Sequence, residues 1–425
     1  MSATEAPEVA GSRDAGGWID FRIGYQAAFN GLRGFAIVTF MIYHGQAIFQ
    51  SARNVRVLPG AFFWLEMFFV QSGFLIISLL IEEWYRTGRI RILNFYARRA
   101  LRLFPALFVV CAAVALWLLT FAPSWSHVVG WREVWSTLLY VNNWVGIHWH
   151  NSLPLYLGHG WSLSVEEQFY AVAPFVTLGM LAIGWSGRRA IAVVLVCALA
   201  SAIWMVVLSE QGSVVVRLYQ GTDTRAQGFL IGGALAFAAS AGFVFRGAVA
   251  RAAVRVLVWP ALLIVVALLL WAQIDDPLMY HGMFTLAGLS FAVLLAYVVQ
   301  EPQSLLTRAL SVKPLESTGR IAYGIYLWHL PIMVASWNYI YPRHHWSEPL
   351  VITVWIAASI LVASASWRWV EQPFLRYARR FGRIDPAREQ QQIAARLAAL
   401  TDVQTVTPGA ALAQPAPVGE SPTPR

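Results

Sequence analysis

Residues 101–121 read LRLFPALFVVCAAVALWLLTF, and after Arg102 this stretch contains no charged side chain. An α-helix needs about 20 predominantly apolar residues to cross the hydrocarbon core of a bilayer, and this run supplies them. The segment before it, residues 84–102 (WYRTGRIRILNFYARRALR), is rich in arginine. The two segments together predict a membrane-spanning helix with a basic flank at one end.

The composition of the whole chain supports a membrane protein. Of the 425 residues, 58% are hydrophobic and only 12% are charged, and the mean hydropathy is +0.56. A soluble globular domain carries about 25% charged residues, so the composition excludes a soluble enzyme of this length. Two cysteines, Cys111 and Cys197, lie inside apolar runs and are interpreted as small hydrophobic residues, not as a disulfide or a metal site.

Long apolar runs recur along the chain and predict an all-α integral membrane protein with about ten transmembrane helices. The expected spans are 29–49, 61–82, 101–121, 165–184, 190–209, 226–244, 256–273, 282–300, 321–338 and 350–370.

Basic residues gather in alternate loops, and the net charge is +9. Loops that stay in the cytosol retain Lys and Arg, so both termini are expected in the cytosol. The same rule explains the charge better than binding to nucleic acid does.

Three regions follow from this reading: a cytosolic N-terminal segment (1–28), a transmembrane domain (29–375) and a cytosolic tail (376–425). The first 20 residues lack an apolar core, so no cleavable signal is expected. The tail is predicted to contain one short amphipathic helix at 386–400 and a disordered end. The long stretch 122–164, rich in Trp, Asn and His, is expected to pack over the outer mouth of the bundle.

Ionisable residues inside spans are costly and usually mark function. The first span contains Arg33 and His44, eleven residues apart, which places both on one helix face with roughly 16 Å of rise between them. Arg33 has an alternative role as an anchor that reaches the interface, and His44 as a structural hydrogen-bonding group. A neutral imidazole is nevertheless suited to take a proton from a hydroxyl that attacks a thioester.

The segment 161–170, WSLSVEEQFY, contains adjacent acids, Glu166 and Glu167. Neighbouring residues on a helix point about 100° apart, so both cannot face one cavity. One of them is a candidate to orient His44, whereas carboxylates solvated at a helix start are the alternative. Spacing alone does not decide between these readings. Trp161, which opens the segment, is a candidate for acceptor binding.

Further polar residues in or near spans are candidates for substrate binding, each with a structural alternative. Glu66 would otherwise be an interfacial acid. Asp223 and Arg225 would otherwise pair with each other. Tyr323 and His329 would otherwise be a belt aromatic and a structural histidine.

Seven segments in order, from about Asn30 to Pro373, resemble the blocks of the membrane-bound acyltransferase family 3. They are NGLRGFAIVTFMIYH, FFVQSGFLI, YARRALRLFPAL, WSLSVEEQFY, GTDTRAQGFLIGG, AYGIYLWHLPI and SWRWVEQPF. The first resembles the family signature of an arginine and a histidine separated by ten residues, here Arg33 and His44. The resemblance also favours Glu166 over Glu167. Gln227 departs from the family pattern, in which many members have an acid.

The resemblance implies a multi-pass enzyme of the bacterial cytoplasmic membrane that transfers an acetyl or succinyl-like group from acyl-CoA to a hydroxyl of an envelope glycan or glycolipid. It implies no metal. His44, Glu166 and Arg33 are then the expected catalytic residues. Arg98, Arg99 and Arg102 form a basic cluster suited to the phosphates of coenzyme A, with contact to membrane lipids as the alternative.

Two other functions fit the same residues. A related enzyme would acylate a small molecule such as a macrolide. A proton-coupled transporter would also need Arg, Glu and His inside its spans.

Overall fold

The structure is a computed structural model that describes residues 8–9, 21–49, 57–149, 156–339 and 346–381. These residues belong to one compact unit, Met1–Gly382. The amphipathic helix predicted at 386–400 lies outside the described residues.

Ten long α-helices dominate the described part of this unit: α1 (Ala27–Phe49), α2 (Trp64–Thr87), α3 (Ile92–Thr120), α6 (Trp161–Ala182), α7 (Gly187–Glu210), α9 (Thr222–Ser240), α10 (Ala248–Trp271), α11 (Met283–Gln300), α14 (Ala322–Tyr339) and α16 (Glu348–Ser366). Shorter helices are α4 (His127–Leu138), α5 (Asn142–His148), α8 (Val215–Gln220), α12 (Leu305–Leu310), α13 (Lys313–Arg320) and α17 (Gln372–Ala378). Tight turns of helix are η1 (Ala61–Phe63), η2 (Ser124–Ser126), η3 (Gly158–Gly160), η4 (Pro277–Tyr280) and η6 (Arg379–Phe381), and η5 (Trp367–Glu371) is π-helical. A two-residue ladder pairs β1 (Glu8–Val9) with β2 (Phe21–Arg22) in antiparallel fashion.

Each of the ten ranges predicted as spans falls on one of the long helices. Among the described residues, six helical stretches are long and apolar enough to cross a membrane: Ala61–Thr87, Ile92–Thr120, Gly187–Glu210, Ala248–Trp271, Met283–Gln300 and Glu348–Ala378. The other four predicted spans lie on α1, α6, α9 and α14. For them, and for the placement of both termini in the cytosol, membrane crossing stays a prediction.

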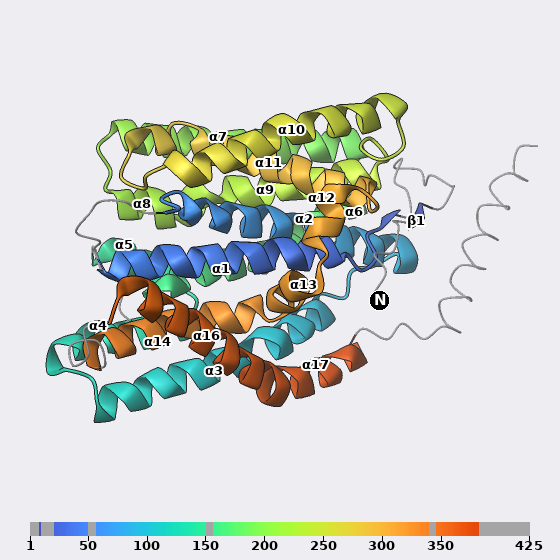
Figure 1. Cartoon of the computed structure of the whole chain (residues 1–425). Helices are drawn as coiled ribbons and strands as arrows, with labels where there is room; N and C mark the ends of the chain where they lie inside the picture. The colour runs from blue at the N-terminus through green and yellow to red at the C-terminus, as the bar shows by residue number, and fades with distance from the viewer. Residues whose placement is uncertain (1–7, 10–20, 50–56, 150–155, 340–345, 382–425) are drawn as a thin grey trace, which may run out of the picture. The chain divides into compact units, whose positions relative to one another are not determined.

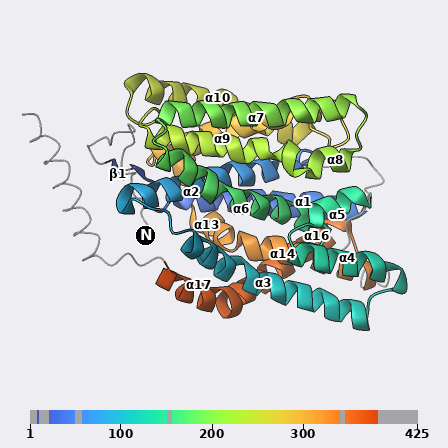
Figure 2. The ribbon, with the colours of Figure 1, turned by 180° about the vertical axis from the view of Figure 1, so that it is seen from behind.

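The least apolar long helices lie in the interior. Figures 1 and 2 show α1, α2 and α9 between a layer of α7 and α10 and a layer of α3 and α16. In the most apolar part of α2, 83% of residues are buried inside the protein, but only 22% are buried in α10. Large apolar side chains such as Trp259 and Leu263 on α10 are exposed, as expected for a helix that faces lipid. The central helices can therefore carry polar residues away from lipid.

Glycines allow the central helices to approach each other closely. A Cβ atom added to Gly232 of α9 would stand 2.0 Å from the carbonyl oxygen of Val70 in α2, and one on Gly73 of α2 would stand 2.1 Å from that of Phe229. Small residues at helix contacts are typical of membrane bundles because packing replaces the hydrophobic driving force there. The α2–α9 contact is therefore a fixed part of the scaffold behind the site.

The aromatic stretch at 122–164 is structured where it is described. It forms α4, α5 and the turns η2 and η3. Glu133 of α4 accepts a hydrogen bond from the backbone N–H of Leu157 at 2.7 Å, and Asn142 donates to Thr137 Oγ1 at 2.9 Å. These bonds join parts of the stretch to one another, and Glu133 and Asn142 line a cavity of the bundle. The position of the stretch over the outer mouth stays a prediction.

Candidate functional site

Two cavities lie along α1. One, called the histidine pocket here, has a volume of about 700 Å³; the other, called the basic pocket, has a volume of about 580 Å³. Leu65 and Tyr326 line both cavities. Since His44 lines the first cavity and Arg33 the second, the shared helix face predicted for these two residues does point into the protein interior. Leu65 and Tyr326 therefore belong to a wall that the two cavities share.

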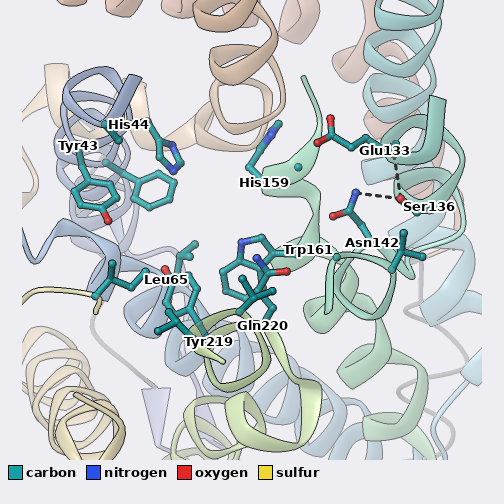
Figure 3. A pocket seen from close by; sticks show the side chains of 18 of the residues that line it. Tyr43, His44, Leu65, Glu133, Ser136, Asn142, His159, Trp161, Tyr219 and Gln220 are labelled. Atoms are coloured by element: carbon teal, nitrogen blue, oxygen red, sulfur yellow. Dashed lines mark hydrogen bonds between the residues drawn. The ribbon is translucent and has the colours of Figure 1, made fainter. Parts of the chain in front are cut away.

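Aromatic rings and amides surround the histidine pocket (Figure 3). α1 contributes Tyr43 and His44, and the start of α6 contributes Trp161, which the sequence analysis had named. Further polar lining comes from the aromatic stretch, from α8, from the loop after α10 and from α14: Arg132, Glu133, Ser136, Asn142, His159, Tyr219, Gln220, Asp275 and Tyr326. Flat rings with amide and carboxylate groups between them suit a polar ligand that has apolar faces, such as a sugar ring.

His44 is hydrogen-bonded to another imidazole. His44 Nδ1 lies 3.0 Å from His329 Nε2, and the two rings are stacked, with centroids 5.2 Å apart and planes 9° from parallel. His329 on α14 is fully buried, and its Nδ1–H donates to the carbonyl oxygen of Tyr326 at 2.7 Å. His44 itself is partly exposed toward the cavity. One side of the His44 ring is therefore fixed by the hydrogen bond to His329, and the other side is accessible from the cavity.

A third imidazole, His159, lies beside this pair. Its ring meets that of His329 edge-to-face at 4.9 Å and that of Tyr326 at 4.9 Å. The side chain is 97% buried, and neither ring nitrogen has a hydrogen-bond partner among the described residues. A buried polar atom without a partner is uncommon. His159 was not among the residues predicted from the sequence. Its position two residues before Trp161, within an aromatic loop, was the signal available.

The basic pocket contains Arg33 and the predicted cluster of Arg98, Arg99 and Arg102. The cluster is not in a loop: it lies within α3, which begins nine residues earlier than the predicted span. Arg98 pairs with Glu83 at 3.4 Å, and Arg99 pairs with Glu167 at 3.7 Å.

Arg33 and Arg102 have guanidinium N–H groups that make no hydrogen bond to a described residue. Arg33 donates through Nε to Gln71 at 2.8 Å, which leaves its two terminal nitrogens without a hydrogen bond to any described residue. Arg102 is exposed toward the cavity and has no hydrogen-bond or ion-pair partner among the described residues. These donors are free to bind an anion, for which a guanidinium is the preferred partner.

Glu166 does not orient His44 in the structure. Its carboxylate accepts hydrogen bonds from Ser72 at 2.6 Å and from the hydroxyl of Tyr170, and it lines the basic pocket. The expected Glu166–His44 pairing is therefore absent among the described residues, and His329 takes that place. The two glutamates do diverge as expected, since Glu167 turns to Arg99.

Four of the predicted substrate-binding residues line neither pocket: His329, which lies behind His44, and Glu66, Arg225 and Asp223. Glu66 and Arg225 are fully buried and form an ion pair with each other, with Nη2 and Oε2 2.8 Å apart. Asp223 pairs with Arg217 and accepts a hydrogen bond from Trp204 at 2.8 Å. The suggested Asp223–Arg225 pair is wrong because the two side chains, two residues apart, leave α9 in different directions. Tyr323, by contrast, lines the basic pocket and donates to the carbonyl of Leu103 at 2.8 Å.

No group of three or more His, Cys, Asp or Glu side chains suited to hold a metal ion occurs among the described residues.

Comparison with known proteins gives one family and several relatives. A family described as an acyltransferase domain matches residues 26–368. O-acetyltransferase OatA of Staphylococcus aureus is 32% identical over 357 residues, covering 82% of this chain and 57% of the relative. Peptidoglycan O-acetyltransferase OatA of Listeria monocytogenes is 30% identical over 367 residues, covering 82% of this chain and 56% of the relative. A putative peptidoglycan O-acetyltransferase of Bacillus subtilis is 31% identical over 361 residues, with shares of 82% and 55%.

The chain thus spans little more than half the length of these curated relatives. No solved structure matches it significantly.

Proposed function

This chain belongs to the membrane acyltransferase family 3, and on that premise we propose that it transfers an acetyl or similar acyl group to a hydroxyl of an envelope glycan. The proposal rests on one observation above all: a partly exposed imidazole, His44, lies in an aromatic pocket that shares a wall with a pocket of arginines. The relatives named as peptidoglycan O-acetyltransferases support the glycan as acceptor. The bacterial cytoplasmic membrane is the proposed location.

Acyl-CoA is the proposed donor, bound with its phosphates in the basic pocket. Arg102 and the free end of Arg33 offer guanidinium donors there, while Arg98 and Arg99 are already paired with acids. Phosphate oxygens accept charge-assisted hydrogen bonds from such donors. On the predicted orientation this pocket opens toward the cytosol, where acyl-CoA is made. The thin pantetheine arm would bring the thioester to the wall formed by Leu65 and Tyr326.

The acceptor is proposed to bind in the histidine pocket. Its volume of about 700 Å³ lies within the range of ligand sites. Trp161 and Tyr219 offer rings for stacking, and Asn142 and Gln220 offer amides for hydroxyl groups.

The reaction is a proton transfer coupled to acyl transfer. His44 takes the proton of the acceptor hydroxyl while the hydroxyl oxygen forms a bond to the thioester carbonyl carbon. The carbon–sulfur bond then breaks, and the thiolate of coenzyme A receives the proton back from the imidazole. General base catalysis of this kind contributes about 10²–10⁴-fold. Arg33 would stabilise negative charge on the donor during this step.

The test uses purified protein in lipid nanodiscs with radiolabelled acetyl-CoA and peptidoglycan fragments. Labelled, base-labile ester on the fragments supports the proposal, and His44→Ala should reduce its formation at least 100-fold. His127→Ala is the control because His127 bonds the carbonyl of Ala122 and lines neither pocket. Unchanged acyl transfer by the His44→Ala variant would contradict the proposal. Acylation of small molecules such as macrolides, with none of the peptidoglycan fragments, would also contradict it.

A further inference from the structure

The hydrogen bonds of His329 define where its proton lies. A backbone carbonyl only accepts hydrogen bonds, so the 2.7 Å contact with the Tyr326 oxygen requires a proton on His329 Nδ1. A neutral imidazole carries one ring proton, which leaves Nε2 of His329 as an acceptor. A charged His329 is disfavoured because the side chain is fully buried and no carboxylate contacts it among the described residues.

The acceptor role of His329 Nε2 also determines where the proton of His44 lies. His329 Nε2 can only accept, and His44 Nδ1 lies 3.0 Å from it, so His44 Nδ1 must carry a proton. The one remaining lone pair of the neutral His44 ring is then on Nε2. Figure 3 shows the His44 ring projecting toward the cavity, away from α1. From this chain of hydrogen bonds we infer that His329 is a positioning residue that holds His44 in the tautomer with Nε2 free to accept a proton.

This inference rests on the proposed function and assigns His329 a role different from acceptor binding. The order of the groups is Tyr326 carbonyl, His329, His44 and then the acceptor hydroxyl. When Nε2 of His44 takes a proton, the ring becomes a cation that still donates from Nδ1 to His329, so the arrangement need not change during the reaction. A base that is oriented by a third group follows the same logic in other enzymes. Here the third group is a neutral imidazole.

The surroundings of the pair leave His329 as the group that sets the tautomer. His159 touches the His329 ring from the side but makes no hydrogen bond to it. Phe40 packs against the His44 ring at 4.2 Å, and Tyr43 lies 5.8 Å from it, both measured between ring centroids. Arg132 and Glu133 line the same pocket, and Figure 3 shows Glu133 across the cavity from His44. The ring contacts orient the His44 plane, but among the described residues only His329 bonds its Nδ1.

A matched pair of substitutions tests the inference by activity. Glutamine places its amide at about the distance of Nε2 in histidine, so His329→Gln keeps an acceptor for His44. Asparagine reaches only as far as Nδ1, so His329→Asn keeps a bond to Tyr326 but not to His44. We expect His329→Gln to stay within about 5-fold of wild-type kcat and His329→Asn to lose roughly 10- to 100-fold, part of what a general base supplies. The acceptor KM should change less than about twofold in both variants.

Equal activity of the two variants, or a loss carried by the acceptor KM, would overturn the positioning role.

A spectroscopic measurement tests the tautomer without any turnover. Solid-state NMR of protein labelled with ¹⁵N-histidine distinguishes protonated from unprotonated ring nitrogens, and the His44→Gln spectrum identifies the His44 signals by their loss. The expected result is a proton on Nδ1 of His44 in the wild-type protein, with a mixture or the other tautomer in His329→Asn. A proton on Nε2 in the wild-type protein would refute the inference. If the tautomer is as expected but no acyl transfer occurs, the proposed function fails and the positioning stands.

Discussion

Separating the buried ion pair of Glu66 and Arg225 should lower the stability of the bundle far more than it alters the chemistry. Both side chains are 0% exposed, and their charged atoms are 2.8 Å apart. The Arg225 guanidinium also lies 4.1 Å from the ring centre of Phe284. Glu66→Gln keeps the shape but leaves the buried cation without its counter-charge. Breaking a buried pair in this way costs about 3–5 kcal/mol, which corresponds to a fall of roughly 3–6 °C in apparent Tm for a chain of this size.

The assay is thermal unfolding in detergent, followed by the loss of the monodisperse peak in size-exclusion chromatography. The double variant Glu66→Gln/Arg225→Met should recover most of the loss of Glu66→Gln, because the uncompensated charge is gone. The control is Glu301→Gln, which breaks an ion pair to an exposed arginine, Arg255 (58% exposed). This change should cost less than about 1 kcal/mol. An unchanged Tm for Glu66→Gln with a raised acceptor KM would refute the structural role and restore Glu66 as a substrate ligand.

Three further predictions concern packing, donor binding and pH. Gly232→Ala should destabilise the α2–α9 contact, since its Cβ would meet the Val70 carbonyl oxygen at 2.0 Å; an unchanged Tm would show that the helices separate freely. Arg102→Gln should raise the KM for acetyl-CoA about tenfold through loss of a charge-assisted phosphate contact. Arg189→Gln, at the exposed start of α7, should leave that KM unchanged, and equal effects of the two variants would argue against the donor site. The third prediction concerns the pH dependence of local stability around His281. Hydrogen bonds from its ring to the Pro277 carbonyl and to Glu210 raise the pKa of His281. The resulting stabilisation is complete below the ordinary value near 6.5 and is lost as pH rises through the higher folded value. The protection of backbone amides in 272–282, measured relative to their intrinsic exchange rate at each pH, should therefore fall above neutral pH in the wild-type protein but not in His281→Gln.

The sequence predicted the long helices because a span needs a continuous apolar run, and such runs are local. It marked Arg33, His44 and Glu66 as candidate functional residues for a related reason: an ionisable group inside a span needs a partner or a wet cavity. Both arguments need no knowledge of neighbouring helices.

Local patterns in the sequence could not predict which side chains on different helices contact each other. His44 and His329 are 285 residues apart, and Glu66 and Arg225 meet from α2 and α9. Glu166 was expected to reach His44 because both are needed for one chemical step, but rotation of α6 turns its carboxylate to Ser72 and Tyr170. Which acid or imidazole meets which base depends on helix rotation and depth. No spacing along the chain contains that information.

The central claim is that donor and acceptor bind in two adjacent pockets that share one wall. The most direct test is an acyl-transfer assay in which the two substrates are on opposite sides of the membrane. Proteoliposomes of uniform orientation would hold peptidoglycan fragments inside, with radiolabelled acetyl-CoA added only to the side on which the basic pocket is predicted to open. The account predicts acylated fragments in the lumen, formed by wild-type protein and not by His44→Ala. Acylation only when both substrates share one side would contradict it.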